Sequence, residues 1–249
     1  EIKCVFKDSF GIIWIGTDNG INKIDPSKQQ FLHYKASQHS PKSSNNTWSF
    51  WENDSLFLSG YDNGLQVFKK NNNAYYWIPF SGLILDIISF KDTILLGTSK
   101  GVYSLAQKDS SYSIDSLFFD VSHNGNQDVI FKFLKTKNKL LIGSLNYLSL
   151  YDENLTLKKR WDLKNVRDFT ELNNTIYFIA HPTGLYQLIN LENEAEIVTT
   201  PLKEVEHLLG LSIEQSEDHD IWLGFYGGGV IKYNTKNKSR EHYSTKNGL

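Results

Sequence analysis

The side chains of this chain that could do chemistry are aromatic and polar residues in short turns and at the starts of strands. Tyr and Trp rings can stack on the faces of sugars, and nearby Asp, Asn, Arg, Lys and His can bind hydroxyl or acidic groups. Such a mixture suits a carbohydrate-binding site, although each residue taken alone is as readily an ordinary turn residue. We predict these ligand-binding residues: Trp48, Tyr61, Asp62, Asp86, Lys100, Asp128, Arg167, His181 and Tyr226.

Patterns typical of metal binding or catalysis are weak. The seven His residues are scattered, and none has a metal-like spacing beside Cys or clustered carboxylates. No nucleophile-elbow phrase is present, although a triad assembled in space stays open. Paired carboxylates for glycosidase chemistry also stay open, but the Asp and Glu residues mostly fall in turns. We therefore predict no catalytic residues, no metal and no cofactor.

The strands that must position these residues belong to a short sequence motif, here called the repeated phrase, which occurs six times along the chain. Its clearest copy is Trp14-Ile15-Gly16-Thr17-Asp18-Asn19-Gly20-Ile21. A Gly-Tyr-Asp-Asn-Gly copy follows at 60–64, and later copies are more degraded. The first small residue of each copy falls at 16, 60, 97, 143, 180 and 224, a mean period of about 42 residues. This period is typical of the four-stranded blade of a β-propeller.

The local pattern within each copy is that of β-strands. Ile12–Ile15 form a short apolar run between two glycines, and Asn19-Gly20 is a strong hairpin turn. No window has a sustained helical period, so we expect no helix. The strands expected, in units of four, are 2–7, 12–16, 21–24 and 31–34; 48–51, 56–60, 65–68 and 75–78; 85–90, 94–97, 102–105 and 113–118; 129–134, 140–143, 148–151 and 157–161; 166–172, 176–180, 185–188 and 196–200; 208–214, 221–224, 230–233 and 239–243.

The sequence thus predicts an all-β propeller of four-stranded antiparallel blades in a single domain, 1–249. The approximate units are 1–40, 41–80, 81–122, 123–163, 164–203 and 204–249. Six units are visible, so the ring either closes with six blades or belongs to a seven-bladed ring or larger array. The repeated phrase is interpreted as structural: Trp14 and Trp222 would pack between blades, and Gly16 and Gly224 would let neighbouring backbone approach.

Composition narrows the possible partners. A net charge of −2 gives no support for a nucleic-acid partner. The chain has one cysteine, Cys4, and so no disulfide within it. It has neither an apolar run of 18 residues nor a leader, and no direct membrane contact is expected. Because it contains no Met, we interpret it as a piece of a longer repeat array, whose signal peptide or membrane span would lie outside it.

The first unit also carries a family signature. The run from Phe6 to Thr17, with Asn19-Gly20-Ile21, Asp25, Phe31 and Tyr34, resembles the two-component regulator propeller repeat nearly throughout. The sixth unit, with Asp220-Ile221-Trp222-Leu223-Gly224 and Tyr243, is the next best match. The four middle units lack the Trp, and the fourth has Tyr147 where a turn Gly is expected.

The resemblance implies the periplasmic sensor region of a Bacteroides-type hybrid two-component histidine kinase. It implies an oligosaccharide ligand, a neighbouring propeller or β-sandwich domain of the same chain, a homodimer in the full-length receptor, and no catalysis by this region. A protein–protein scaffold propeller, and a propeller lyase or glycosidase, are the alternatives. In any propeller of this kind, the turns between second and third strands and the starts of first strands share one end, where we expect the ligand.

Overall fold

A computed structural model gives the fold of the chain. It describes residues 2–7, 9, 12–17, 20–24, 46–109, 111–116, 122–123, 126–182, 184–191, 195–216 and 219–246. The chain divides into two compact units, Glu1–Lys35 and Ala36–Leu249.

The first unit contains a three-stranded antiparallel sheet of β1 (Ile2–Lys7), β2 (Ile13–Thr17) and β3 (Gly20–Ile24). The strands β2 and β3 pair as an antiparallel hairpin, with Thr17 opposite Gly20, as the hairpin signal predicts. The fourth strand expected at 31–34 lies outside the described residues.

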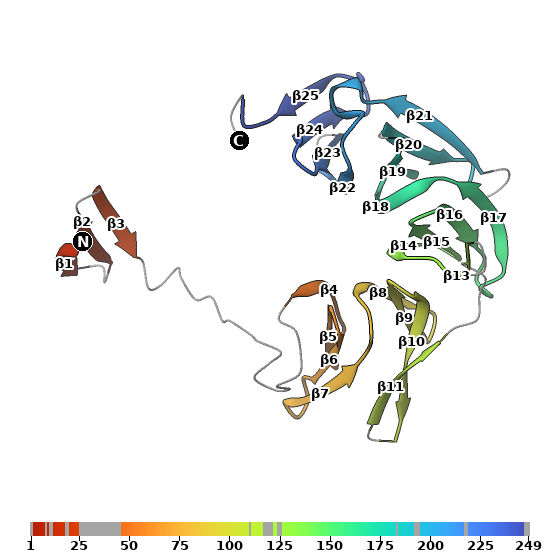
Figure 1. Cartoon of the computed structure of the whole chain (residues 1–249), viewed down its shortest axis with the longest axis horizontal. Helices are drawn as coiled ribbons and strands as arrows, with labels where there is room; N and C mark the ends of the chain where they lie inside the picture. Colours follow the sequence, from red (N-terminus) through yellow and green to blue (C-terminus); the bar gives the residue numbers. More distant parts are fainter. Residues whose placement is uncertain are drawn as a thin grey trace. The chain divides into compact units, whose positions relative to one another are not determined.

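The described residues of the second unit form five four-stranded antiparallel sheets, each built from strands consecutive in the sequence (Figure 1). This arrangement confirms the predicted propeller architecture of four-stranded blades. The strands are β4 (Thr47–Glu52), β5 (Leu56–Tyr61), β6 (Gly64–Lys69) and β7 (Ala74–Pro79); β8 (Ile84–Phe90), β9 (Thr93–Thr98), β10 (Gly101–Lys108) and β11 (Ser111–Ser116); β14 (Ile130–Thr136), β15 (Lys139–Ser144), β16 (Tyr147–Tyr151) and β17 (Leu157–Asp162); β18 (Lys164–Leu172), β19 (Thr175–His181), β20 (Gly184–Ile189) and β21 (Glu196–Pro201); β22 (Gly210–Gln215), β23 (Asp220–Phe225), β24 (Gly229–Asn234) and β25 (Arg240–Tyr243).

Two short elements have no counterpart in the predicted strands. The strands β12 (Ser122–His123) and β13 (Asn126–Gln127) form a two-stranded sheet before β14. A single 3-10 turn, η2 (Lys203–Val205), precedes β22, although no helix was expected. Neither belongs to the repeated phrase, so the period carries no information about them.

Successive sheets of the second unit pack through their first strands. The strand β4 contacts β8, β8 contacts β14, β14 contacts β18, and β18 contacts β22. The core lies between the sheets, where Leu58, Leu65, Ile84 and Leu96 are fully buried between the first two of the five. Burying one such side chain contributes roughly 1.5–3 kcal/mol. Each sheet therefore depends on its neighbours for burial of its faces.

The small residue of the repeated phrase sits where the next sheet comes closest. A Cβ added to Gly143 would lie 2.5 Å from the carbonyl oxygen of Val166, and one added to Gly60 would lie 2.7 Å from Ile84. At Gly97 the same atom would lie 3.0 Å from Ile130 Cγ2. Glycine thus allows the first strand of the following sheet to approach at these positions.

Trp222 differs from its predicted place between two sheets. Its ring is 36% exposed and stacks on Tyr243 of its own sheet, with 5.8 Å between centroids. The sheet β22–β25 is the last of the described sheets, and its other face packs against β18–β21. The side chains of Trp14 and Gly16 lie outside the described residues.

Candidate functional site

Each first strand begins with an interruption of its pairing to the second strand. In β4, Thr47 pairs with Tyr61 and Ser49 with Gly60, which leaves Trp48 outside the ladder. The interruption recurs near the start of β8, β14, β18 and β22. A β-bulge turns a side chain to a new direction and is frequent beside functional sites. The residues just before the pairing resumes, here called the bulge residues, are Trp48, Leu85, Phe131, Arg167 and Leu211.

The bulges lie at the same end of the sheets as the turns between second and third strands. The antiparallel register places the start of each first strand opposite the end of its second strand, as with Ile84 and Thr98 or Gly210 and Phe225. This end, here called the bulge end, therefore carries both the bulge residues and these turns. The predicted turn residues at this end are Asp62, Lys100, His181 and Tyr226.

Trp48 presents an exposed, oriented ring at this end. Its side chain is 53% exposed, and its Nε1 donates a hydrogen bond to Asp62 Oδ1 at 2.5 Å. Asp62 Oδ2 accepts a second bond from Asn46 Nδ2 at 2.8 Å. The carboxylate thereby restrains the orientation of the indole, while about half of the Trp48 side chain stays open to solvent. An exposed aromatic ring held in this way is suited to stacking on a flat apolar surface such as a sugar face.

Arg167 and Phe131 form a second pair at this end, from neighbouring first strands. The guanidinium carbon of Arg167 lies 4.2 Å from the centre of the Phe131 ring, within cation–π range. Arg167 is half-buried, and its Nε is buried without a hydrogen-bond partner among the described residues. Burial lowers the pKa of Arg167, because a low-dielectric environment disfavours the charged form.

The residues directly after the bulge residues are all polar, and the first four of them link neighbouring first strands. Ser49 Oγ donates to Ile84 O at 2.9 Å, and Asp86 Oδ2 accepts from Phe133 N at 2.8 Å. Asp168 Oδ2 accepts in the same way from Ile213 N at 3.0 Å. These residues, here called the belt residues, are Ser49, Asp86, Lys132, Asp168 and Ser212.

Lys132 joins the two belt carboxylates. Its Nζ lies 3.6 Å from Asp86 Oδ1 and 3.7 Å from Asp168 Oδ1. Burial raises the pKa of Asp86 to about 6, against the lowering effect of Lys132. Burial likewise raises the pKa of Asp168. Asp86, predicted to bind a ligand, is therefore already engaged by Lys132 and by the backbone of the next sheet.

Two other predicted residues have internal partners that hold the fold. Asp128 is buried and accepts bonds from Ser144 Oγ at 2.5 Å and from Asn146 N at 3.0 Å and Nδ2 at 2.9 Å. It fixes the turn between β15 and β16. Tyr61 is buried, and its hydroxyl donates to Gln66 Oε1 at 3.3 Å. Neither side chain presents a free surface to a ligand.

The remaining predicted residues stay at the surface. Tyr226 is 73% exposed in the turn between β23 and β24. Lys100 is exposed and donates from Nζ to Ser81 Oγ at 2.7 Å, and His181 is exposed at the end of β19. The structure thus joins Trp48 to Asp62 and Arg167 to Phe131. The sequence prediction missed Phe131. Its only signal was its position directly before Lys132, the residue that pairs with the repeated glycine Gly143.

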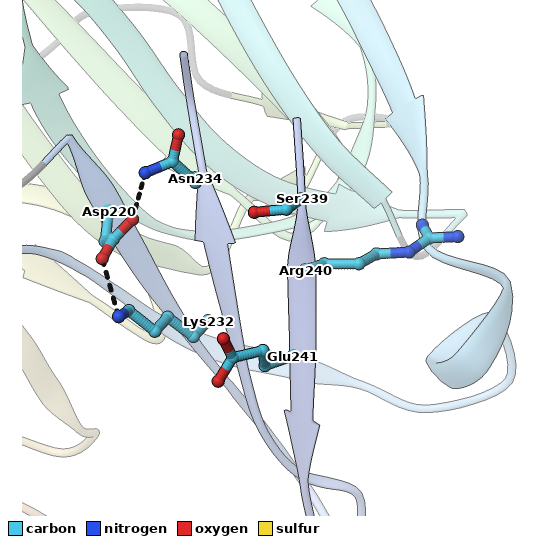
Figure 2. Close-up of a pocket in the computed structure, with 6 residues that line it drawn as sticks. All are labelled: Asp220, Lys232, Asn234, Ser239, Arg240 and Glu241. Atoms are coloured by element: carbon cyan, nitrogen blue, oxygen red, sulfur yellow. Dashed lines mark hydrogen bonds and ion pairs between the residues drawn. The ribbon is translucent and has the colours of Figure 1, made fainter. Parts of the chain in front are cut away.

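A polar hollow of about 120 Å³ lies elsewhere, on the outer strands of the last sheet (Figure 2). Lys232 Nζ lies 2.8 Å from Asp220 Oδ2, and Asn234 Nδ2 donates to Asp220 Oδ1 at 2.6 Å. These hydrogen bonds lower the pKa of Asp220. Arg240 Nε pairs with Glu204 at 3.0 Å. The charges here are matched within the protein, so this hollow is a weaker candidate than the bulge end. Its lining residues are Asp220, Lys232, Asn234, Ser239, Arg240 and Glu241.

The described part of the chain holds no group of three or more His, Cys, Asp or Glu residues placed to bind a metal ion. It also holds no helix with the length and apolar character needed to cross a membrane.

The repeat signature is confirmed in the first unit of the sequence. Residues 1–19 match the family model described as "Two component regulator propeller". No curated protein matches the chain.

Solved structures share the fold over nearly the whole chain. The extracellular domain of BT3049, named as a hybrid two component system of B. thetaiotaomicron, is 19% identical, with a TM-score of 0.69 over 100% of this chain and 35% of its own. That of BT4673, named likewise, is 20% identical, with a TM-score of 0.60 over 99% of this chain and 34% of its own. The Cps50 (Swd1) β-propeller domain of Myceliophteria thermophila is 10% identical, with a TM-score of 0.65 over 97% of this chain and 85% of its own.

These similarities place the chain among β-propellers. Identities of 10–20% show the fold alone. The chain spans about a third of the two bacterial extracellular domains.

Proposed function

We propose that this chain is a non-catalytic, periplasmic sensor propeller of a hybrid two-component histidine kinase, and that it binds an oligosaccharide. The repeat signature at residues 1–19 and the likeness to two extracellular domains of proteins so named support the sensor class. The observation that carries the ligand class is the exposed indole of Trp48, whose orientation Asp62 restrains.

The bulge end suits such a ligand because apolar and polar contacts lie together there. The Trp48 ring offers a flat aromatic plate for stacking, and Tyr226, in the turn between β23 and β24, offers a second exposed ring. Sugars expose apolar ring faces and hydroxyl edges, so plates of this kind give affinity while nearby polar groups give orientation. In the full receptor, a neighbouring propeller or β-sandwich domain and a second copy of the chain would carry the signal onward. Binding would then shift the population of two signalling states.

Titration calorimetry with a panel of oligosaccharides tests this proposal. We expect at least one member to bind the chain, and Trp48→Ala to weaken that binding at least tenfold. Trp222→Ala is the matched control, since that Trp is also partly exposed but lies on the face of the last sheet. It should change affinity less than twofold.

Two results would contradict the proposal. If no oligosaccharide binds and the chain instead holds a stable protein partner, the region is a scaffold propeller. If the chain degrades a polysaccharide, it is an enzyme. Removing residues 46–246 from the receptor should also abolish glycan-dependent induction of its target genes.

A further inference from the structure

We propose that Arg167, stacked on Phe131, binds an anionic group of the ligand, so that the oligosaccharide recognised at the bulge end carries a carboxylate or a sulfate. This inference rests on the proposed function for the sugar, but the anion position itself follows from the side chains alone.

The first step concerns the charge of Arg167, which the described residues leave uncompensated. None of the described carboxylates forms an ion pair with its guanidinium, and its Nε is buried without a hydrogen-bond partner among the same residues. An arginine removed from water is normally paired, because an isolated charge is costly to bury. This half-buried charge is therefore available to an anionic ligand.

The neighbouring carboxylates are already committed to other partners. Asp168 is next to Arg167 in sequence, but its Oδ1 faces Lys132 at 3.7 Å and its Oδ2 accepts from Ile213 N at 3.0 Å. Asp86 is held by Lys132 and Phe133. Burial is the sole cause of the lowered pKa of Arg167, and no carboxylate opposes it. The belt therefore does not supply the missing anion.

The second step concerns the geometry that Phe131 imposes. The aromatic ring at 4.2 Å covers one face of the guanidinium and fixes its plane. A guanidinium held in plane presents its remaining N–H donors as a rigid fork. Such a fork matches the oxygen pairs of a carboxylate or a sulfate, which it binds with two parallel hydrogen bonds. A neutral hydroxyl would use one donor and leave the charge unmatched.

Arg160 shows what a satisfied arginine looks like in this fold. It also stacks on an aromatic ring, with 4.9 Å from its guanidinium to the centre of Tyr147. In contrast to Arg167, its Nε donates to Ser149 Oγ at 3.2 Å. Arg160 lies on β17, the fourth strand of its sheet, whereas the bulge residues lie on first strands. The chain therefore provides its own matched control.

Three sets of probes test the proposal by calorimetry on the chain: oligogalacturonides for carboxylates, chondroitin sulfate oligosaccharides for sulfates, and neutral xylo-oligosaccharides. We expect at least one acidic set to bind at least tenfold tighter than the neutral set, and its binding to weaken with added NaCl. Arg167→Gln should reduce that binding tenfold or more, and Arg167→Lys should restore part of it. Arg160→Gln should leave it unchanged.

Stability separates a binding role from a structural one. Arg167→Gln removes the stacking contact with Phe131 but no ion pair among the described residues, so the midpoint of thermal unfolding should fall by no more than about 4 °C. A larger fall in the midpoint would show that Arg167 supports the fold, and would overturn the proposal.

The outcomes distinguish this inference from the proposed function. If neutral oligosaccharides bind in a Trp48-dependent way while acidic ones bind no better, the anion position is wrong and the sensor proposal stands. If no oligosaccharide binds but free sulfate or acetate binds and depends on Arg167, the anion position stands and the oligosaccharide proposal fails. If no probe binds, both are overturned.

Discussion

The bulge residues and the belt residues lie one position apart on the same first strands, yet their surroundings differ. The belt carboxylates Asp86 and Asp168 are each bonded to the backbone of the next sheet. Among the bulge residues, Trp48 and Leu211 are exposed, and Arg167 has a buried Nε without a described partner. On the same strands, the belt residues thus hold the sheets together, and the adjacent bulge residues, here called the bulge level, are available for binding.

This difference shows why the interruption of pairing matters. Without a bulge, each bulge residue would pair with a residue of the second strand, and its side chain would follow the regular alternation of the sheet. The extra residue removes Trp48 from that pattern without disturbing Ser49 and Gly60 one position on. A change at the belt level should therefore affect the free energy of unfolding, and a change at the bulge level should affect binding.

The largest effect is expected at the glycine opposite the belt. Gly143 pairs with Lys132, and a Cβ there would lie 2.5 Å from the backbone oxygen of Val166. Gly143→Ala should lower the free energy of unfolding by about 3 kcal/mol, because neither backbone can move away within a packed interface. Urea unfolding followed by tryptophan fluorescence measures the change.

Gly227→Ala is the control for that substitution. Gly227 has φ of +69° and nothing within 4 Å of the added atom, so only backbone strain of about 1 kcal/mol is expected. Equal losses for the two variants would mean that the close approach of the next sheet adds no cost at the repeated glycine.

A pH-dependent effect is expected from the belt carboxylate Asp86. Its pKa rises from 3.8 to about 6 on folding, so the folded state disfavours its ionised form. Its contribution to stability is therefore full below pH 4 and is lost as the pH rises to about 6. At 1.36 kcal/mol per pKa unit, the loss is about 2–3 kcal/mol.

Asp86→Asn should flatten this part of the stability profile. Asp168 has a pKa raised in the same direction and shares Lys132, so a smaller slope should remain. Urea midpoints measured between pH 4 and pH 7 check the prediction. A slope unchanged by the substitution would show that another group titrates in this range.

Much of the fold could be predicted from the sequence, because the repeated glycine and the alternating apolar residues are local signals. The bulges could not, since they depend on which residue of the second strand each residue of the first strand faces. Asp86 and Asp128 were predicted as ligand-binding residues from their position at strand starts. The partners that hold Asp86 and Asp128 come from segments distant in sequence, so a local pattern could not reveal them. Phe131 was missed because a lone Phe in a strand indicates a core residue.

A smaller loss of stability is expected from the buried turn carboxylate. Asp128→Ala would leave the N–H donors of Asn146 without their acceptor and remove the bond from Ser144 Oγ, and should lower the free energy of unfolding by about 2 kcal/mol. Asp62→Ala is the matched control at the corresponding turn of another sheet, where Trp48 and Asn46 are exposed to water. It should lower stability by less than 1 kcal/mol, and equal losses would remove the distinction between the two carboxylates.

The smallest effect is expected at the bulge level itself. Leu211 is 40% exposed and follows Gly210, while Ile213 two positions later is buried in the core between the last two sheets. Leu211→Ser should change the free energy of unfolding by no more than about 0.5 kcal/mol, as for other surface substitutions. Ile213→Ser, on the same strand, should lower it by several times as much, because it buries a hydroxyl and leaves a cavity. If the two losses were similar, the bulge residues would belong to the core. Trp48 and Arg167 would then be better explained as packing than as binding residues.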